Sequence, residues 1–185
     1  SFSSKRVNLY NQHPVILNAN FPTTFLDYPT VCFMRAEVES YSATWFQAGI
    51  EASLEKWGAT PGTYVADIMA KYNATTTNEQ KKEMIITQKY INLLLQSHEA
   101  WAEYRRTGYP SFLVKPGDVT YINSNGTSIT FNPVSGCESG SNIVARFKYP
   151  SSEFTLNKTN VEAAVARMGE DSHRQRVWWA GGGLQ

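Results

Sequence analysis

Two glutamates in one short stretch of the sequence, Glu99 and Glu103, have the residue type and spacing that hydrolysis of a glycosidic bond could use. Glycosidases place two carboxyl groups on opposite sides of the scissile bond, and one of them has a raised pKa. Residues four apart on a helix share a face, with about 5–6 Å between their Cβ atoms. Since any charged helix offers this spacing, a glycoside hydrolase is only one of the functions that the sequence leaves open.

Aromatic and basic side chains in the same stretch, Glu99–Pro110, suggest two other roles. Trp101 and Arg105 are four apart, so on a helix the guanidinium can lie over the indole ring, a contact worth about 0.5–2 kcal/mol. Arg106 follows Glu103 by three residues and can offset the repulsion between the two glutamates. The stretch is either a ligand site or, as we favour, a helix whose aromatic residues lie in the core and whose arginines hold a distant loop.

The sequence has no spacing typical of a metal or cofactor site. His13, His98 and His173 are far apart, and none has a cysteine or a second histidine nearby. The chain contains no P-loop, no dinucleotide-binding fingerprint and no Gly-x-Ser-x-Gly motif. We therefore expect no metal, no cofactor and no catalytic residue.

Composition narrows the range of partners. The 185 residues suit one domain, and a formal net charge of +1 without a large basic cluster argues against a nucleic-acid partner. No run of 18 apolar residues and no basic, apolar leader is present, so we expect neither a transmembrane helix nor a signal peptide, but a mature form or a fragment. Cys32 is predicted to be a core residue and Cys137 to lie in a loop; a disulfide between them stays open.

The first half of the chain predicts a helical hairpin. Asp27 can cap a helix whose first turn contains Pro29, and Arg35 and Glu39 can pair on its exposed side. A second helix is predicted from Ser42 to a left-handed cap at Gly58. The predicted apolar face of the first helix consists of Val31, Met34, Val38 and Tyr41, and that of the second contains Phe46, Ile50 and Trp57.

Two further helices are predicted before the Glu99–Pro110 stretch. Thr60 and Pro61 are expected to begin one that ends by Asn73. Thr77 and Gln80 resemble a capping box that opens a helix continuing to Gln96. The predicted apolar side of that helix consists of Met84, Ile85, Gln88, Ile91, Leu94 and Leu95.

The second half of the chain mixes helices, loops and strands. A helix is predicted from Ser97 to Gly108, and Pro110 prevents its continuation. Residues 119–122 and 129–131 flank Asn125-Gly126, which predicts a β-hairpin. Residues 143–149 are expected to be extended and residues 157–168 to be helical, while the tail 181–185 should be mobile.

These elements predict a mainly α-helical, TPR-like bundle of helical hairpins with a small β-hairpin and long loops. We expect a single domain over residues 1–185. It would consist of an extended arm (1–22), a helical part (23–108), loops with the hairpin (109–158), and a short helix with the tail (159–185).

Seven segments, in this order and spacing, resemble the C-terminal part of the SusD/RagB family, roughly over residues 20–180. They are Phe25–Glu37, Phe46–Ser53, Ile86–Tyr90, Glu99–Pro110, Arg146–Asn157, Asn160–Ala164 and Arg176–Ala180. The resemblance implies a non-catalytic outer-membrane lipoprotein that binds glycan, such as starch, or another nutrient, in some relatives a peptide. It also implies delivery to a SusC-like, TonB-dependent transporter. Family members are considerably longer, so the resemblance implies a surface-facing protein of the outer membrane whose lipid anchor lies in a missing N-terminal half.

The resemblance also assigns roles to residues. The motif residues Glu99, Trp101, Arg105, Arg106, Gly108, Tyr109, Pro110, Tyr149, Pro150, Ser151 and Ser152 are predicted to be structural. Because sugar rings stack on exposed aromatic side chains, the candidates for ligand contact are Tyr109, Tyr149, Trp178 and Trp179. Two alternatives stay open beside capture of a glycan: a scaffold that binds no ligand and faces the transporter, and a glycoside hydrolase.

Overall fold

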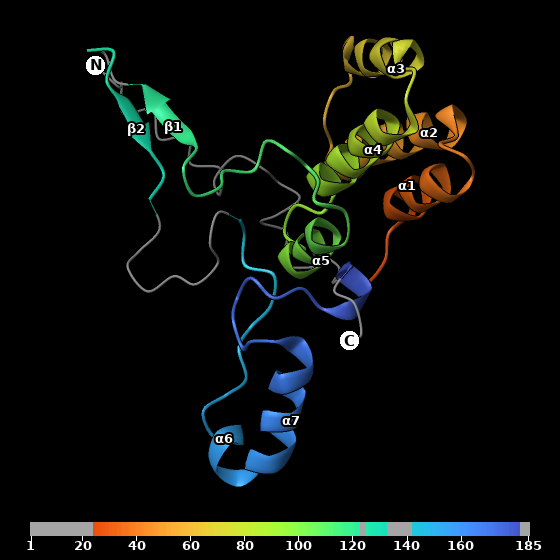
Figure 1. The fold of residues 1–185 in the computed structure, drawn as a ribbon. Helices are drawn as coiled ribbons and strands as arrows, with labels where there is room; N and C mark the ends of the chain where they lie inside the picture. Colours follow the sequence, from red (N-terminus) through yellow and green to blue (C-terminus); the bar gives the residue numbers. More distant parts are fainter. Residues whose placement is uncertain (1–23, 123–124, 133–141, 182–185) are drawn as a thin grey trace. The chain divides into compact units, whose positions relative to one another are not determined.

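The computed structural model describes residues 24–122, 125–132 and 142–181 (Figure 1). The chain divides into two compact units, Ser1–Gln96 and Ser97–Gln185, and each is described by itself. The described residues contain seven α-helices, one short 3₁₀ helix and one two-stranded sheet, as the sequence predicts for a mainly α-helical protein with a small β-hairpin. The assignment of all 185 residues to a single domain stays a prediction.

The first unit begins with the predicted helical hairpin, α1 (Tyr28–Val38) and α2 (Ala43–Lys56). The Asp27 side chain accepts a hydrogen bond from the Thr30 backbone N–H at 2.8 Å, and Ser42 caps α2 in the same way. Ser40 and Tyr41, at φ of 56° and 60°, reverse the chain between the helices. Both helix starts are therefore confirmed, and both depend on side chains within three residues of the backbone groups that they cap.

Aromatic rings fill the core of this unit. Phe46 lies between Phe33 and Tyr72, with ring centroids 6.3 and 4.3 Å away, and all three are almost completely buried. Ile50 and Ile85 complete the core beside them. The rings bring together α1, α2 and α3 (Tyr64–Ala74), while Ile85 adds α4 (Asn78–Asn92).

The buried faces of α1 and α4 differ from the predicted ones. On α1, Cys32, Phe33 and Ala36 are buried, whereas Met34 and Val38 are 43% and 78% exposed. The predicted apolar side of α4 is wrong at three further positions that are about half exposed: Ile91, Leu94 and Leu95. Ile85 and Gln88 are buried as predicted, whereas the buried residues Ile86, Lys89 and Asn92 were not predicted to face the core.

Partners from other helices explain why a polar residue of α4 is inside. Asn92 is completely buried, and its side-chain amide donates to both carboxylate oxygens of Asp27 at 3.2 Å and to the Thr30 hydroxyl at 3.1 Å. Lys56 forms an ion pair with the same carboxylate. Burial alone would raise the pKa of Asp27, but hydrogen bonds from Lys56 and Thr30 lower it below its usual value. Asp27, Thr30, Lys56 and Asn92, named here the polar node, join α1, α2 and α4.

Two helix boundaries in this unit were predicted wrongly. Helix α3 begins at Tyr64 rather than at Pro61, because Gly62 adopts φ of 50° and interrupts a right-handed helix there. Helix α4 starts after Thr77 as predicted but ends at Asn92, four residues before Gln96, and Leu95 adopts φ of 70°. Thr77 accepts a hydrogen bond from the Gln80 backbone N–H, which is the first bond of the predicted capping box, and its hydroxyl donates to the Gln80 side-chain oxygen at 2.8 Å.

The second unit contains α5 (Ser97–Thr107), the hairpin β1 (Val119–Ile122) and β2 (Ser128–Thr130), α6 (Glu153–Leu156), α7 (Lys158–Met168) and the 3₁₀ helix η2 (Trp178–Ala180). The strands are antiparallel, and Gly126 adopts φ of 79° at the predicted turn. Residues 143–149 form no strand, and α6 was not predicted. Helix α7 lies within the predicted range, and Gly169 ends it at φ of 89°.

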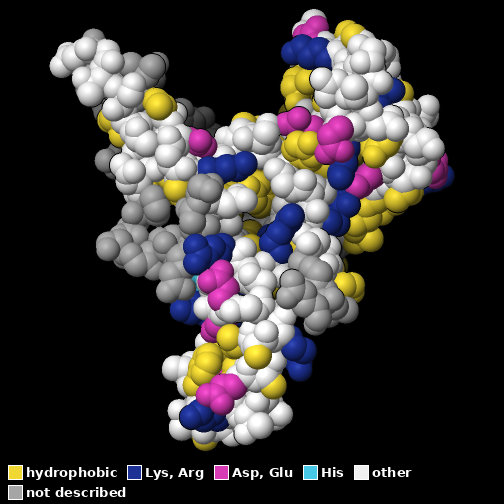
Figure 2. Space-filling model, in the orientation of Figure 1, with side chains coloured by type: hydrophobic (Ala, Val, Ile, Leu, Met, Phe, Trp, Pro, Cys, Tyr) yellow, Lys and Arg dark blue, Asp and Glu magenta, His cyan; other side chains and the backbone are white. Residues whose placement is uncertain are grey.

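Several predictions fall on residues that the structure does not describe: the arm 1–22, Cys137, and most of the tail. Cys32 is a free, fully buried thiol, as expected of a core residue. Within the described ranges, none of the helices has the length and hydropathy needed to cross a membrane. Phe25, Leu26 and Tyr28, at the start of α1, are 92%, 60% and 62% exposed. Figure 2 shows hydrophobic side chains gathered on the surface next to helix α1.

Candidate functional site beside helix α5

Helix α5 holds a distant segment of the second unit through its aromatic and basic side chains. The indole N–H of Trp101 donates to the Val144 carbonyl at 2.8 Å, and a guanidinium N–H of Arg105 donates to the Ala145 carbonyl at 3.2 Å. These bonds span about forty residues of sequence and hold residues 144 and 145 against α5; a purely structural role for Trp101 and Arg105 stays a prediction.

Arg105 also stacks on two indole rings. Its guanidinium carbon lies 3.7 Å from the ring centroid of Trp101 and 4.6 Å from that of Trp179 in η2. Burial lowers the pKa of Arg105 from its usual value, because desolvation disfavours the charged form. Its Nε atom is buried and makes no hydrogen bond to any described residue.

The two glutamates that suggested hydrolysis have unequal surroundings. Both oxygens of Glu103 accept hydrogen bonds from Arg106, at 2.9 and 3.0 Å, as the i, i+3 spacing predicts. Glu99 is exposed in the first turn of the same helix. Arg106 therefore engages both carboxylate oxygens of Glu103 that a catalytic role would need.

The other motif residues form turns that frame this site. Gly108 adopts φ of 79° directly after α5, and the Tyr109–Pro110 peptide bond is cis, with Pro110 fully buried. The Tyr149 backbone N–H lies 3.2 Å from both carboxylate oxygens of Asp171. Pro150, Ser151 and Ser152 then form an exposed turn into α6.

An ion pair holds the Tyr149 segment in place. Arg146 and Asp171 lie 2.7 Å apart with side chains only 9% and 10% exposed, and the Arg146 guanidinium stacks on the Tyr149 ring at 4.9 Å. His173 supports the same segment, because its backbone carbonyl accepts a hydrogen bond from the Ala145 backbone N–H at 2.7 Å.

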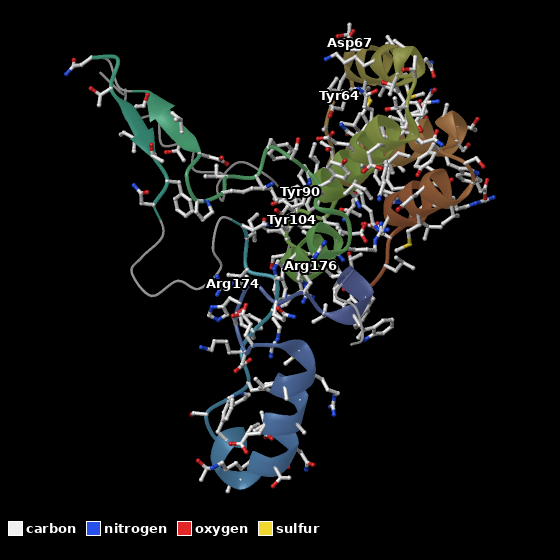
Figure 3. All side chains as sticks on the ribbon, viewed as in Figure 1. Tyr64, Asp67, Tyr90, Tyr104, Arg174 and Arg176 are labelled. Atoms are coloured by element: carbon white, nitrogen blue, oxygen red, sulfur yellow. The ribbon has the colours of Figure 1, made fainter. Side chains whose placement is uncertain are left out.

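A cleft of about 370 Å³ lies beside α5 within the second unit. Figure 3 labels three of the residues that line it: Tyr104, Arg174 and Arg176. The full lining consists of Tyr104, Arg105, Thr107, Gly108, Asn142, Ile143, Ala145, Arg174, Arg176 and Ala180. Three arginines and several hydrogen-bonding groups therefore face one small volume.

The four predicted aromatic contacts are not brought together in this cleft. Trp179 stacks on Arg105, Tyr149 stacks on Arg146, and none of the four lines the cleft. Trp178 and Trp179 keep 68% and 40% of their surface exposed, whereas Tyr109 and Tyr149 are half-buried. A role for these four residues in ligand contact stays a prediction.

Sequence reasoning did not identify Asn142 and Arg174 as lining residues. Asn142 accepts a hydrogen bond from the Tyr104 hydroxyl at 2.9 Å across 38 residues of sequence. Arg174 follows α7 and precedes the Trp178-Trp179 pair by a few residues. The alternation of Arg174 and Arg176 just before that pair was the available signal. In the part of the chain that the structure describes, no three His, Cys, Asp or Glu residues group as metal ligands.

Comparisons with known proteins agree on one family. A family model described as "starch-binding associating with outer membrane", SusD-like, matches residues 1–150. The solved structure of the Bacteroidetes AC2a SusD-like protein is 30% identical, with a TM-score of 0.65, over 84% of this chain and 30% of its own. A chitin-binding SusD homologue from Flavobacterium johnsoniae is 25% identical, with a TM-score of 0.61, over 82% of this chain and 35% of its own.

A further structure shows the fold alone. A SusD homologue from Bacteroides vulgatus is 22% identical, with a TM-score of 0.69, over 92% of this chain and 38% of its own. No curated protein matches. The chain therefore spans about a third of the length of these solved structures. With the family model covering most of the sequence and this fold shared with solved relatives, the chain belongs to the SusD-like family.

Proposed function

We propose that the chain is part of a glycan- or nutrient-binding protein that captures an oligosaccharide at the outer surface of the cell and passes it on without chemistry. The observation that carries this proposal is the SusD-like family match over residues 1–150, a family model described as starch-binding. The chitin-binding relative from Flavobacterium supports a glycan as the ligand.

The proposed partners are a SusC-like, TonB-dependent transporter and the remaining part of a longer SusD-like polypeptide. The family description, association with the outer membrane, supports the location, and a lipid anchor outside this chain is part of the proposal. The chain spans about a third of its solved relatives, and Phe25, Leu26 and Tyr28 expose large hydrophobic surfaces, which supports a further protein surface next to α1.

The proposed ligand contacts are Trp178, Trp179, Tyr109 and Tyr149. Trp178 and Trp179 have the best support, because these residues are 68% and 40% exposed and a sugar ring can stack on an exposed indole. The contacts of Glu103 support a role without catalysis, since Arg106 occupies both of its carboxylate oxygens.

The test is glycan binding by the protein at its full natural length, measured by tryptophan fluorescence and calorimetry. Starch and chitin oligosaccharides are the first ligands, and chromatography of each mixture detects any product. We expect a change in fluorescence without product, and weaker binding in Trp178→Ala but not in the control Trp45→Phe, which changes an indole of the first unit.

Two outcomes would overturn the proposal. Absence of binding to any glycan or peptide, together with retention of the transporter on mild extraction, would favour the scaffold alternative. Release of product that is lost in Glu99→Gln or Glu103→Gln would identify a glycoside hydrolase instead.

A further inference from the structure

The cleft beside α5 carries positive charge that the fold does not neutralise. Of its three arginines, Arg174 is balanced: its Nε and one terminal nitrogen lie 2.9 and 3.2 Å from the two carboxylate oxygens of Glu170. The Glu170 carboxylate also accepts a hydrogen bond from Ser172 at 2.7 Å. Arg174 therefore adds shape and hydrogen-bonding groups to the cleft but little net charge.

Arg105 and Arg176 have no such partner. Neither forms an ion pair with any residue in the described part of the chain. Arg105 is held by the Ala145 carbonyl and two indole rings, and Arg176 donates to the Arg105 backbone carbonyl at 3.3 Å. Carbonyls and rings orient a guanidinium but leave its charge in place.

Neutral polar groups stand beside this charge. The Tyr104 hydroxyl and the Asn142 side chain meet at 2.9 Å on the cleft lining, and Thr107 supplies a hydroxyl. Sugar hydroxyls need such donors and acceptors, while a guanidinium binds a carboxylate or sulfate through two parallel hydrogen bonds. At about 370 Å³, the cleft is near the small end of ligand sites, roughly 300–1,000 Å³, which suits a single sugar unit.

We propose that the cleft between Arg105 and Arg176 binds the anionic substituent of an acidic sugar, a carboxylate or a sulfate ester. Arg176 provides the accessible fork, and Arg105 provides a second charge fixed between Trp101 and Trp179. An acidic glycan should thus bind this cleft more tightly than its neutral counterpart. This inference rests on the proposed function, because it names the class of glycan that is captured.

The experiment compares acidic and neutral forms of one glycan on the protein at its full natural length. Calorimetry measures the dissociation constants of an oligogalacturonate, of its methyl ester, which has the same rings without charge, and of a sulfated oligosaccharide. We expect the methyl ester to bind at least about tenfold more weakly than the acid, because a charge-assisted bidentate contact is lost. The ratio between the uronate and the sulfated ligand identifies which anion the cleft takes.

A matched pair of variants places the effect in the cleft. Arg176→Gln removes a charge from the lining and should weaken binding of the acid about tenfold, and binding of the methyl ester by a smaller factor. Arg167→Gln removes an exposed arginine from the last turn of α7, outside the cleft, and should change neither. Circular dichroism checks that both variants fold. If Arg176→Gln does not fold, the dissociation constants of the acid and the ester on the unchanged protein still test whether the charge of the ligand contributes to binding.

The outcomes separate the two proposals. Equal affinity for acid and ester, or an unchanged affinity in folded Arg176→Gln, overturns the acidic-sugar inference and leaves glycan capture intact. Binding of starch or chitin oligosaccharides, without binding of the oligogalacturonate or the sulfated oligosaccharide, likewise overturns the acidic-sugar inference alone. Absence of binding to any glycan overturns both.

Discussion

Removing the carboxylate of Asp171 should destabilise the second unit strongly. Asp171 and Arg146 form an ion pair at 2.7 Å with side chains 10% and 9% exposed, and Asp171 also accepts from the Tyr149 backbone N–H. Loss of one partner from a buried pair costs about 3–5 kcal/mol, because the other charge stays buried without compensation. We therefore expect Asp171→Ala to lower the free energy of unfolding by about 3–5 kcal/mol.

Urea unfolding, followed by circular dichroism and by hydrogen exchange of residues 142–181, measures this loss and places it in the second unit. The matched control is Glu162→Ala, which breaks the Lys158–Glu162 pair of α7, 3.7 Å apart with side chains 68% and 57% exposed. Exposed pairs contribute about 0.2–1 kcal/mol, so the control should be almost neutral.

A double variant separates the pair from the uncompensated charge. Arg146→Met with Asp171→Leu removes both charges and should cost less than Asp171→Ala alone, since apolar replacements of similar size leave no buried charge. The reasoning is refuted if Asp171→Ala costs less than about 1 kcal/mol or no more than Glu162→Ala.

Three further outcomes follow from single contacts. Gly49→Ala should lower the thermal midpoint of unfolding, because the new Cβ would lie 2.6 Å from the Phe33 ring. Such overpacking costs about 1–3 kcal/mol, more than the roughly 0.5–1 kcal/mol gained by replacing a helical glycine. An unchanged midpoint would contradict this. Burial, with a smaller effect of Tyr41, raises the pKa of Tyr72 to about 12, so its contribution to stability is complete below pH about 10 and is lost as the pH rises toward 12. Absorbance at alkaline pH should show this late titration, which Tyr72→Phe would remove, and a Tyr72 that ionises near pH 10 would show that the ring is not buried. Trp101→Phe should cost about 1–3 kcal/mol in a urea titration, because the Val144 carbonyl loses its indole donor; a loss no greater than that of Trp45→Phe would argue against it.

Local signals were predicted well from the sequence. Asp27, Ser42 and Thr77 cap helices, and Asn125-Gly126 forms the hairpin turn, because each signal acts on backbone groups only a few residues away. The stacking of Arg105 on Trp101 was predictable for the same reason, since four residues on a helix fix the geometry.

Features set by distant partners were not predictable. Val38 reads as a core residue yet is exposed, and Asn92 reads as polar yet is buried, because only the partners of each helix decide which face is inside. The residues that line the cleft could not be predicted for the same reason. Its lining joins Tyr104 to Asn142 and to the arginines near η2, and no period along the chain connects those segments.

The polar node has a consequence for the order in which the first unit can form. Asp27 caps α1 early in the chain, but its partners Lys56 and Asn92 follow 29 and 65 residues later. Closing the loop between Asp27 and Asn92 costs chain entropy, and only the completed contact offsets this cost. The pairing of Asn92 with Asp27 is therefore a late event of folding. During synthesis, Asp27 and Lys56 are both made before Asn92, so the node stays incomplete until α4 is present. Asn92, at the end of α4, then supplies the remaining hydrogen bonds to Asp27 and Thr30. These bonds fix α4 against the hairpin of α1 and α2.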